Sequence, residues 1–191
     1  MRVCIFASSS SRISNEYAEA ASELGKLLAT AGAEVVFGGG GIGLMGKLAD
    51  TVIENNGTIT GVIPSFMKEQ GWNHSCVNEM IITDDMGQRK KQMFAMSDAV
   101  VALPGGVGTL EELTEAITLK QLGLFRGPII ILNTLNFYKS LIDFFEHMVA
   151  EYFLRYEHKS IWEIASTPGE VMILLEKKES WLFDPIKIAK I

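Results

Sequence analysis

The chain has 191 residues, of which 48% are hydrophobic and 21% charged, a profile typical of one globular domain with a sizeable core. Its net charge of −6 argues against a general nucleic-acid or membrane surface, and no apolar run is long enough for a membrane span or signal peptide. At this length we expect a single domain over residues 1–191. The two cysteines, Cys4 and Cys76, lack metal-ligand spacing, and we expect them in a reducing cytoplasm.

Strand and helix patterns alternate along the chain. Apolar runs predict strands at residues 3–7, 34–37, 58–63, 80–83, 99–103, 128–133 and 160–164. Helical periodicity with capping and stop signals predicts helices at residues 14–30, from the glycine turn at 38–46 to 55, and at 84–97, 109–123, 138–151 and from 167 onward. Residues 65–78 show neither pattern, and we expect an irregular excursion near the site.

Several of these strands are apolar on both faces, and the helices between them give βαβ spacing. The sequence therefore predicts an α/β fold: a Rossmann-like doubly wound parallel sheet with helices on both faces. Ligands of such folds bind beyond the carboxyl ends of the strands. That edge is expected to collect residues 8–12, residues 38–46, the region after Thr83 and residues 104–112.

The stretch Leu103-Pro104-Gly105-Gly106-Val107-Gly108-Thr109-Leu110-Glu111-Glu112 follows a buried strand and opens a helix. Because the turn is rich in glycine, backbone N–H groups at the positive helix end are accessible to a phosphate. No Lys-Ser or Lys-Thr pair follows the last glycine, so this is not a Walker-type loop. Thr109 and Glu112 match a capping box. Alternatively, the Glu112 carboxylate lies beside a bound ribose and stabilises an oxocarbenium-like transition state.

A second glycine turn, Gly41-Ile42-Gly43-Leu44-Met45-Gly46, formally matches G-x-G-x-x-G. It follows the second strand, and no acidic residue lies about 20 positions further on to bind a ribose hydroxyl. A tight turn with close helix–sheet packing therefore competes with a dinucleotide site. Two glycine turns at one edge favour a mononucleotide, with one turn for phosphate and the other for sugar or base.

The remaining candidate residues have both structural and functional interpretations. Arg89-Lys90-Lys91 is either a solvated helix face or a place where Arg89 reaches the strand edge and binds a phosphate or ribose oxygen. The histidines His74, His147 and His158 lack metal-ligand spacing, and we expect them at the surface or in packing. The tryptophans, Trp72, Trp162 and Trp181, are expected in the core or in oligomer contacts.

Four motifs resemble those of the LOG family of cytokinin riboside 5′-monophosphate phosphoribohydrolases, proteins often labelled lysine decarboxylases. In order they are GGGG-x-GLMG at 38–46, M-x-x-RK-x-x-M at 86–93, SDA at 97–99 and PGG-x-GT-x-x-E at 104–112. The resemblance runs from about residue 3 to residue 133. It implies hydrolysis of the N-glycosidic bond of an adenosine-type nucleoside 5′-monophosphate to free base and ribose 5-phosphate, without metal or cofactor, in a homodimer whose sites lie near the subunit interface.

Carried across by this resemblance, Arg89 and Glu112 are the catalytic pair. The substrate-binding residues it implies are Ser8, Gly39, Gly40, Gly43, Met86, Lys90, Gly105, Gly106, Val107, Gly108, Thr109, Leu110, Glu111, Glu115 and Thr118. Plant members usually carry His-Gln or His-Glu where this chain has Gly87-Gln88, and Trp where it has Leu119. The sequence therefore leaves two candidate substrates, a plain purine nucleotide and an N6-prenylated one. Two further alternatives are a nucleotide-binding protein without turnover and a dinucleotide-dependent oxidoreductase, which the missing ribose-binding acid disfavours.

Overall fold

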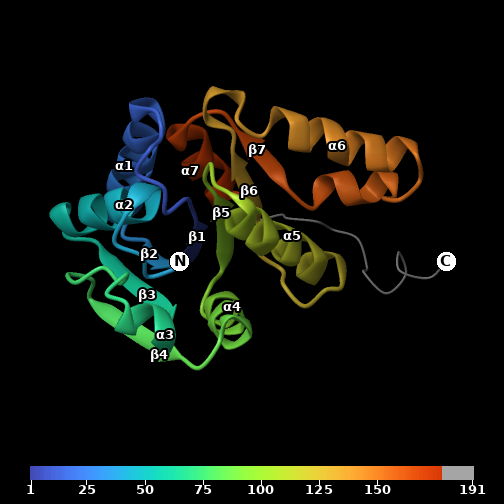
Figure 1. Cartoon of the computed structure of the whole chain (residues 1–191). Helices are drawn as coiled ribbons and strands as arrows, with labels where there is room; N and C mark the ends of the chain where they lie inside the picture. The colour runs from blue at the N-terminus through green and yellow to red at the C-terminus, as the bar shows by residue number, and fades with distance from the viewer. Residues whose placement is uncertain (178–191) are drawn as a thin grey trace.

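The computed structural model describes residues 1–177, and their strands form one parallel sheet in the order β4-β3-β2-β1-β5-β6-β7 (Figure 1). The strands are β1 (Arg2–Phe6), β2 (Glu34–Phe37), β3 (Thr58–Pro64), β4 (Glu79–Thr83), β5 (Ala99–Ala102), β6 (Ile129–Leu132) and β7 (Glu163–Ala165). Neighbouring strands are parallel throughout. The expected α/β doubly wound sheet is therefore confirmed.

Helices cover both faces of the sheet (Figure 1). One apolar core packs against α1 (Asn15–Thr30), α2 (Gly43–Glu54) and α7 (Pro168–Glu176). The core on the opposite face packs against α4 (Met86–Ala95), α5 (Val107–Gln121) and α6 (Lys139–Ala150). The short helix α3 (Ser65–Glu69) and two 3₁₀ turns, η1 (Thr134–Asn136) and η2 (Tyr156–Ser160), complete the elements. Within residues 1–177, no helix combines the length and the apolar character needed to cross a bilayer.

The central strand β1 shows why the sheet is covered on both sides. Val3 and Ile5 point into one core, whereas Cys4 and Phe6 point into the other, so these four residues are all buried. β1 pairs with β2 on one side and with β5 on the other. The chain order therefore changes direction between β1 and β5, and in doubly wound sheets this switch point opens a crevice beyond the strand ends.

Several boundaries differ from the sequence prediction by one or two residues, and two differences change the interpretation. The last strand was expected at 160–164, but β7 spans Glu163–Ala165, because residues 156–160 form the turn η2. Helix α5 begins at Val107, with Gly106 as its N-cap, so Thr109 lies inside the first turn and the predicted capping box is wrong. The excursion at 65–78 does contain the one-turn helix α3.

The aromatic and imidazole side chains divide between the core and the surface. Trp162 is buried as expected, whereas Trp72 is half exposed. Trp181 lies outside the described residues. His74 and His158 are buried and His147 is exposed, so the histidines lie in packing and surface positions as expected.

Candidate functional site

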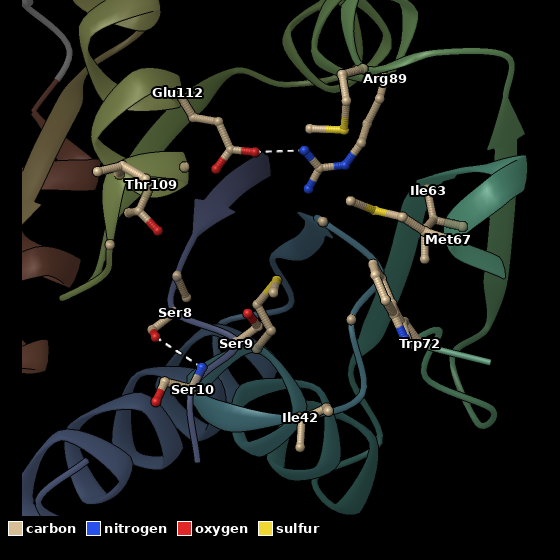
Figure 2. Close-up of a pocket in the computed structure, with 18 residues that line it drawn as sticks. Ser8, Ser9, Ser10, Ile42, Ile63, Met67, Trp72, Arg89, Thr109 and Glu112 are labelled. Atoms are coloured by element: carbon tan, nitrogen blue, oxygen red, sulfur yellow. Dashed lines mark hydrogen bonds and ion pairs between the residues drawn. The ribbon is translucent and has the colours of Figure 1, made fainter. Parts of the chain in front are cut away.

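A cavity of about 640 Å³ opens at the carboxyl edge of the sheet, beside the switch point between β1 and β5 (Figure 2). Five segments line it: the loop after β1, the glycine turn after β2, the end of β3 with the segment that follows, the start of α4 and the first turns of α5. These segments include the four regions that the sequence placed at this edge. The loops that follow parallel strands meet here because all strand ends point the same way.

The N-terminus of α5 is the feature of the cavity that suits an anion. The N-cap is Gly106, which has no side-chain cap, and the first N–H groups of a helix lack partners within the helix itself. Gly106, Val107, Gly108 and Thr109 all line the cavity. Backbone donors and the positive end of the helix dipole therefore face the space where an anion would bind.

The second glycine turn serves a different purpose. At the start of α2, the backbone amides of Leu44 and Met45 donate to the carbonyl oxygen of Ser8 at 2.9 and 3.3 Å. Gly43 has φ +67°, and a Cβ there would lie 2.6 Å from the carbonyl carbon of Ser9. The G-x-G-x-x-G spacing thus lets the loop after β1 pack onto this helix end. The structure supports a tight turn here and leaves α5 as the helix end that is open to phosphate.

Arg89 and Glu112 form an ion pair at the wall of the cavity. Arg89 Nη1 lies 2.6 Å from Glu112 Oε1, and Arg89 Nε donates to the carbonyl oxygen of Val62 at 3.0 Å. Both residues are buried, with 6% and 7% of their surfaces exposed. The guanidinium fits because Gly38 has no side chain: a Cβ there would lie 2.1 Å from Arg89 Nη2. Gly38, which directly follows β2, therefore determines where the Arg89 guanidinium can lie.

Burial and charge act in opposite directions on Glu112. Burial raises the pKa of its carboxyl above the ordinary value, and the nearby Arg89 guanidinium opposes this increase only in part. A carboxylate in such a site interacts strongly with any positive charge that develops in the cavity, because little water screens it. The pair can therefore stabilise a cationic transition state and hold a polar group by hydrogen bonds.

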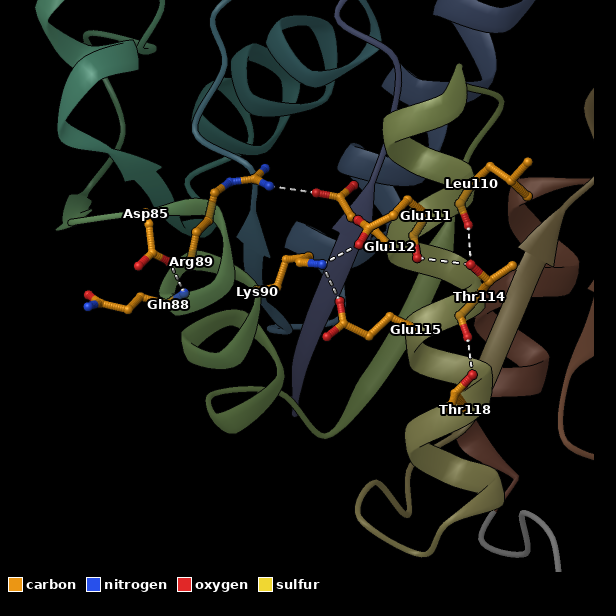
Figure 3. A network of polar contacts seen from close by, with 10 residues as sticks. All are labelled: Asp85, Gln88, Arg89, Lys90, Leu110, Glu111, Glu112, Thr114, Glu115 and Thr118. Atoms are coloured by element: carbon orange, nitrogen blue, oxygen red, sulfur yellow. Dashed lines mark hydrogen bonds and ion pairs between the residues drawn. The ribbon is translucent and has the colours of Figure 1, made fainter.

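Next to the cavity, Lys90 joins α4 to α5 through carboxylates (Figure 3). Its ammonium contacts Glu111 and lies 2.7 Å from Glu115 Oε2. Burial opposes the charged form of Lys90, but the two carboxylates together raise its pKa. Further along α5, the Thr118 hydroxyl donates to the carbonyl oxygen of Thr114 at 2.8 Å. This network holds the two helices together outside the cavity lining.

The structure divides the predicted site residues into two groups. Those that line the cavity are Ser8, Gly40, Met86, Arg89, Gly106, Val107, Gly108, Thr109 and Glu112. Those outside its lining are Gly39, Gly43, Lys90, Gly105, Leu110, Glu111, Glu115 and Thr118.

The sequence placed residues 8–12 and 38–46 at this edge and residues 65–78 near the site. It named none of the following lining residues as site residues: Ala7, Ser9, Ser10, Gly38, Ile42, Met45, Ile63, Met67 and Trp72. Met67 and Trp72 carried a usable signal, because they are large apolar residues in a segment without helical or strand periodicity. Within residues 1–177, no group of three or more His, Cys, Asp or Glu side chains is arranged to hold a metal ion.

Fold and cavity together define a class of protein: doubly wound α/β proteins with an uncapped helix N-terminus lining a cavity at the switch point of the sheet. The comparisons with known proteins refine this class. A family model described as "Possible lysine decarboxylase" matches residues 45–175. The chain is 41% identical over 180 residues to the "Probable cytokinin riboside 5'-monophosphate phosphoribohydrolase LOGL6" of Oryza sativa subsp. japonica, covering 94% of this chain and 71% of the relative.

A second plant relative, the cytokinin riboside 5′-monophosphate phosphoribohydrolase LOG1 of Arabidopsis thaliana, is 37% identical over 198 residues, covering 98% of this chain and 93% of its own. The chain therefore belongs to the LOG family. Among solved structures, a molybdenum cofactor binding protein from Rippkaea orientalis matches with a TM-score of 0.70 at 22% identity, covering 92% of this chain and 94% of that one. The molybdenum cofactor carrier protein of Chlamydomonas reinhardtii matches with 0.69 at 24% identity, covering 92% and 98%. At these identities the likeness concerns the fold.

Proposed function

We propose that this protein hydrolyses the N-glycosidic bond of adenosine-type nucleoside 5′-monophosphates, including N6-modified ones, to free base and ribose 5-phosphate. The observation that carries the proposal is the buried Arg89–Glu112 pair next to the uncapped N-terminus of α5. Its plant relatives are named for this reaction on cytokinin riboside 5′-monophosphates. A pyridoxal-phosphate decarboxylase binds its cofactor through a lysine side chain. None of the described residues that line the cavity is a lysine, so the lysine decarboxylase label has no counterpart there.

The cavity suggests how the substrate is oriented. The phosphate binds to the N–H groups at the start of α5, beside Thr109 and Ser8. The ribose then lies near Glu112 and Arg89, which come from α5 and α4. Because binding of the remote phosphate fixes the sugar, part of that binding energy can lower the barrier at the glycosidic bond.

In the reaction, the C1′–N9 bond breaks and its electron pair leaves with the base, which takes up a proton. Positive charge develops on the ribose ring, and the Glu112 carboxylate stabilises it. The same carboxylate guides a water molecule, whose oxygen forms the new bond to C1′ as its proton is released. Arg89 holds Glu112 in place and donates to the ribose phosphate or the leaving base.

The test is incubation of purified protein with isopentenyl-AMP, AMP and adenosine, with chromatographic detection of free base and ribose 5-phosphate. We expect release from the monophosphates and a rate at least about 10²-fold lower from adenosine, because adenosine lacks the group that α5 binds. Glu112→Gln should reduce kcat by about 10²-fold or more in protein that is still folded. Glu146→Gln is the control, since Glu146 forms an exposed ion pair on α6. Release of no base from any nucleoside monophosphate by folded protein would reject the proposal, and tight binding without turnover would point to a nucleotide-binding protein.

We also propose that two copies associate through the outer face of α4 and α5. Lys90, Glu115 and Thr118 lie on this face, outside the cavity of their own chain, although the family resemblance implies that they contact substrate. Exposed apolar side chains directly after α5, Leu122 and Leu124, support a protein contact there. Light scattering on a size-exclusion column should give twice the chain mass, and Leu124→Glu should give monomers. A monomer at micromolar concentration would reject the proposal. A cytoplasmic location stays a prediction.

A further inference from the structure

The segment between β3 and β4, residues 65–78, provides an apolar wall of the cavity. Its Met67 and Trp72 line the cavity together with Ile63 from β3. Figure 2 shows Met67 and Trp72 on the side opposite Thr109 and Glu112. Arg89 and Glu112 are the charged side chains among the described lining residues, so this wall presents apolar surface to a ligand.

Backbone contacts on both sides of Trp72 join this segment to the glycine turn after β2. The amide of Gly41 donates to the carbonyl oxygen of Trp72 at 3.0 Å. The amide of His74 donates to the carbonyl oxygen of Gly39 at 2.8 Å, and Gly40 and Asn73 form an antiparallel bridge between these two bonds. The position of the Trp72 ring is therefore coupled to a turn that itself lines the cavity.

The side chain of His74 adds a third attachment, to α2. Its Nε2 lies 3.0 Å from Asp50 Oδ1, and its Nδ1 accepts from the backbone amide of Cys76 at 3.2 Å. Since a backbone amide can only donate, Nδ1 is the acceptor nitrogen, and the N–H at Nε2 donates the hydrogen bond to Asp50. The His74 ring is 8% exposed, so both nitrogens and the packing fix its orientation.

We infer that Trp72 determines specificity at the base end of the substrate and that His74 and Asp50 are positioning residues that hold Trp72 in place. The inference rests on the proposed function, because it uses the orientation of the bound nucleotide. With phosphate at α5 and the glycosidic bond at Glu112, the base extends toward residues 65–78. The N6 atom lies on the six-membered ring of adenine, away from N9, so a substituent on N6 is the part of the substrate that reaches Met67 and Trp72.

An apolar N6 substituent buries its surface against this wall, whereas an unsubstituted amine leaves the wall without a partner. A pocket of this kind discriminates by about tenfold or more for each well-buried methylene group. The protein should therefore prefer isopentenyl-AMP to AMP by at least about tenfold in kcat/KM. The preference should depend on the contact between His74 and Asp50, which touches no part of the substrate.

The experiment measures kcat and KM for isopentenyl-AMP and AMP in the wild-type chain and five single variants. Trp72→Ala and His74→Ala should each reduce the preference by about fivefold or more, mainly by raising KM for isopentenyl-AMP. Asp50→Ala should reduce it as His74→Ala does. Asp50→Asn retains an acceptor oxygen for His74 Nε2 and should keep the wild-type preference. A general loss of folding would not separate Asp50→Ala from Asp50→Asn in this way, and His147→Ala, on the exposed surface of α6, should match wild type.

A double variant tests whether His74 acts through Trp72. If it does, Trp72→Ala combined with His74→Ala should show the same preference as Trp72→Ala alone, because no ring is left to position. Full additivity of the two changes, or a wild-type preference in Trp72→Ala or in His74→Ala, would overturn the inference.

Failure of the proposed function gives a separate result. In that case the wild-type protein releases no base from either nucleotide, and the inference is judged by binding. Isopentenyl-AMP should then quench tryptophan fluorescence more strongly than AMP does. The quench should be lost in Trp72→Phe, reduced in His74→Ala and retained in Asp50→Asn. Equal quenching in the wild type and Trp72→Phe would overturn the assignment of Trp72.

Discussion

The position of Arg89 depends on the absence of a side chain at Gly38, and this can be tested by a single substitution. Gly38→Ala adds one methyl group, whose carbon would lie 2.1 Å from Arg89 Nη2. Ordinary contact begins at about 3.4 Å, so the guanidinium must move by roughly 1.3 Å. Little else can adjust, because the methyl group is fixed to the end of β2 and the arginine is buried among β3, α4 and α5.

A shift of this size removes the contacts that hold Arg89. Arg89 Nη1 lies 2.6 Å from Glu112 and Nε lies 3.0 Å from the carbonyl oxygen of Val62, so a displacement of roughly 1.3 Å takes at least one bond beyond hydrogen-bonding range. A hydrogen bond to a charged group contributes about 1.5–3 kcal/mol. We expect the free energy of unfolding to fall by about 2 kcal/mol and kcat to fall by about 10²-fold, since a 1 Å misplacement of a catalytic group has that effect.

The assay combines steady-state kinetics on isopentenyl-AMP with denaturant unfolding. Gly169→Ala is the matched control, because it makes the same chemical change in α7, where the nearest atom to the new Cβ is 4.0 Å away. Adding Gly38→Ala to Arg89→Ala should reduce kcat no further, because no guanidinium is left to displace. Activity of Gly38→Ala within threefold of the wild type would refute the reasoning, as would an equal loss of activity in the Arg89→Ala background.

Three further predictions concern titration and backbone geometry. The raised pKa of Glu112 places the acidic limb of the kcat/KM–pH profile above the ordinary glutamate value of 4.5, because activity needs the carboxylate; Glu112→Gln should abolish this limb. Burial lowers the pKa of Lys120 to about 8, so the unfolded chain binds its proton more tightly and stability should rise between pH 8 and pH 10.5. Lys120→Met should remove that rise and increase the free energy of unfolding by about 1–3 kcal/mol at pH 7, measured in urea. Gly43→Ala combines φ +67° with a Cβ 2.6 Å from Ser9, so thermal unfolding should show a loss of about 2–4 kcal/mol.

The order of the elements could be predicted because buried parallel strands leave a strong signal. Runs such as Val100-Val101 are apolar on both faces, and they alternate with amphipathic helices. The last strand was misplaced because hydrophobicity reports burial without reporting backbone pairing. Ile161 and Trp162 are buried in the core beside α6, but the residues that pair with β6 are Glu163–Ala165.

At the site, local pattern was a poor guide to the partner of Glu112. The T-x-x-E spacing is typical of a capping box, but Gly106 ends the loop three residues earlier, and Glu112 pairs with Arg89, 23 residues away in the sequence. That contact depends on how α4 and α5 pack, which spacing cannot show. Residues 65–78 were correctly expected near the site. Which of their side chains faces the cavity could not be predicted, because backbone hydrogen bonds to the distant glycine turn position Trp72.

Three features that lower stability meet in this cavity, and together they indicate a ligand. The N-terminus of α5 has no side-chain cap, although Thr109 lies within its first turn. The pKa of Glu112 is raised, so its ionised form is disfavoured by burial even with Arg89 beside it. Gly38 adds backbone freedom to the unfolded chain at the end of a strand. Each feature opposes folding, but together they leave N–H groups, a carboxylate and a guanidinium facing one cavity, where a phosphorylated sugar would satisfy them. Nucleoside monophosphates should therefore raise the melting temperature of the wild type more than that of Glu112→Gln.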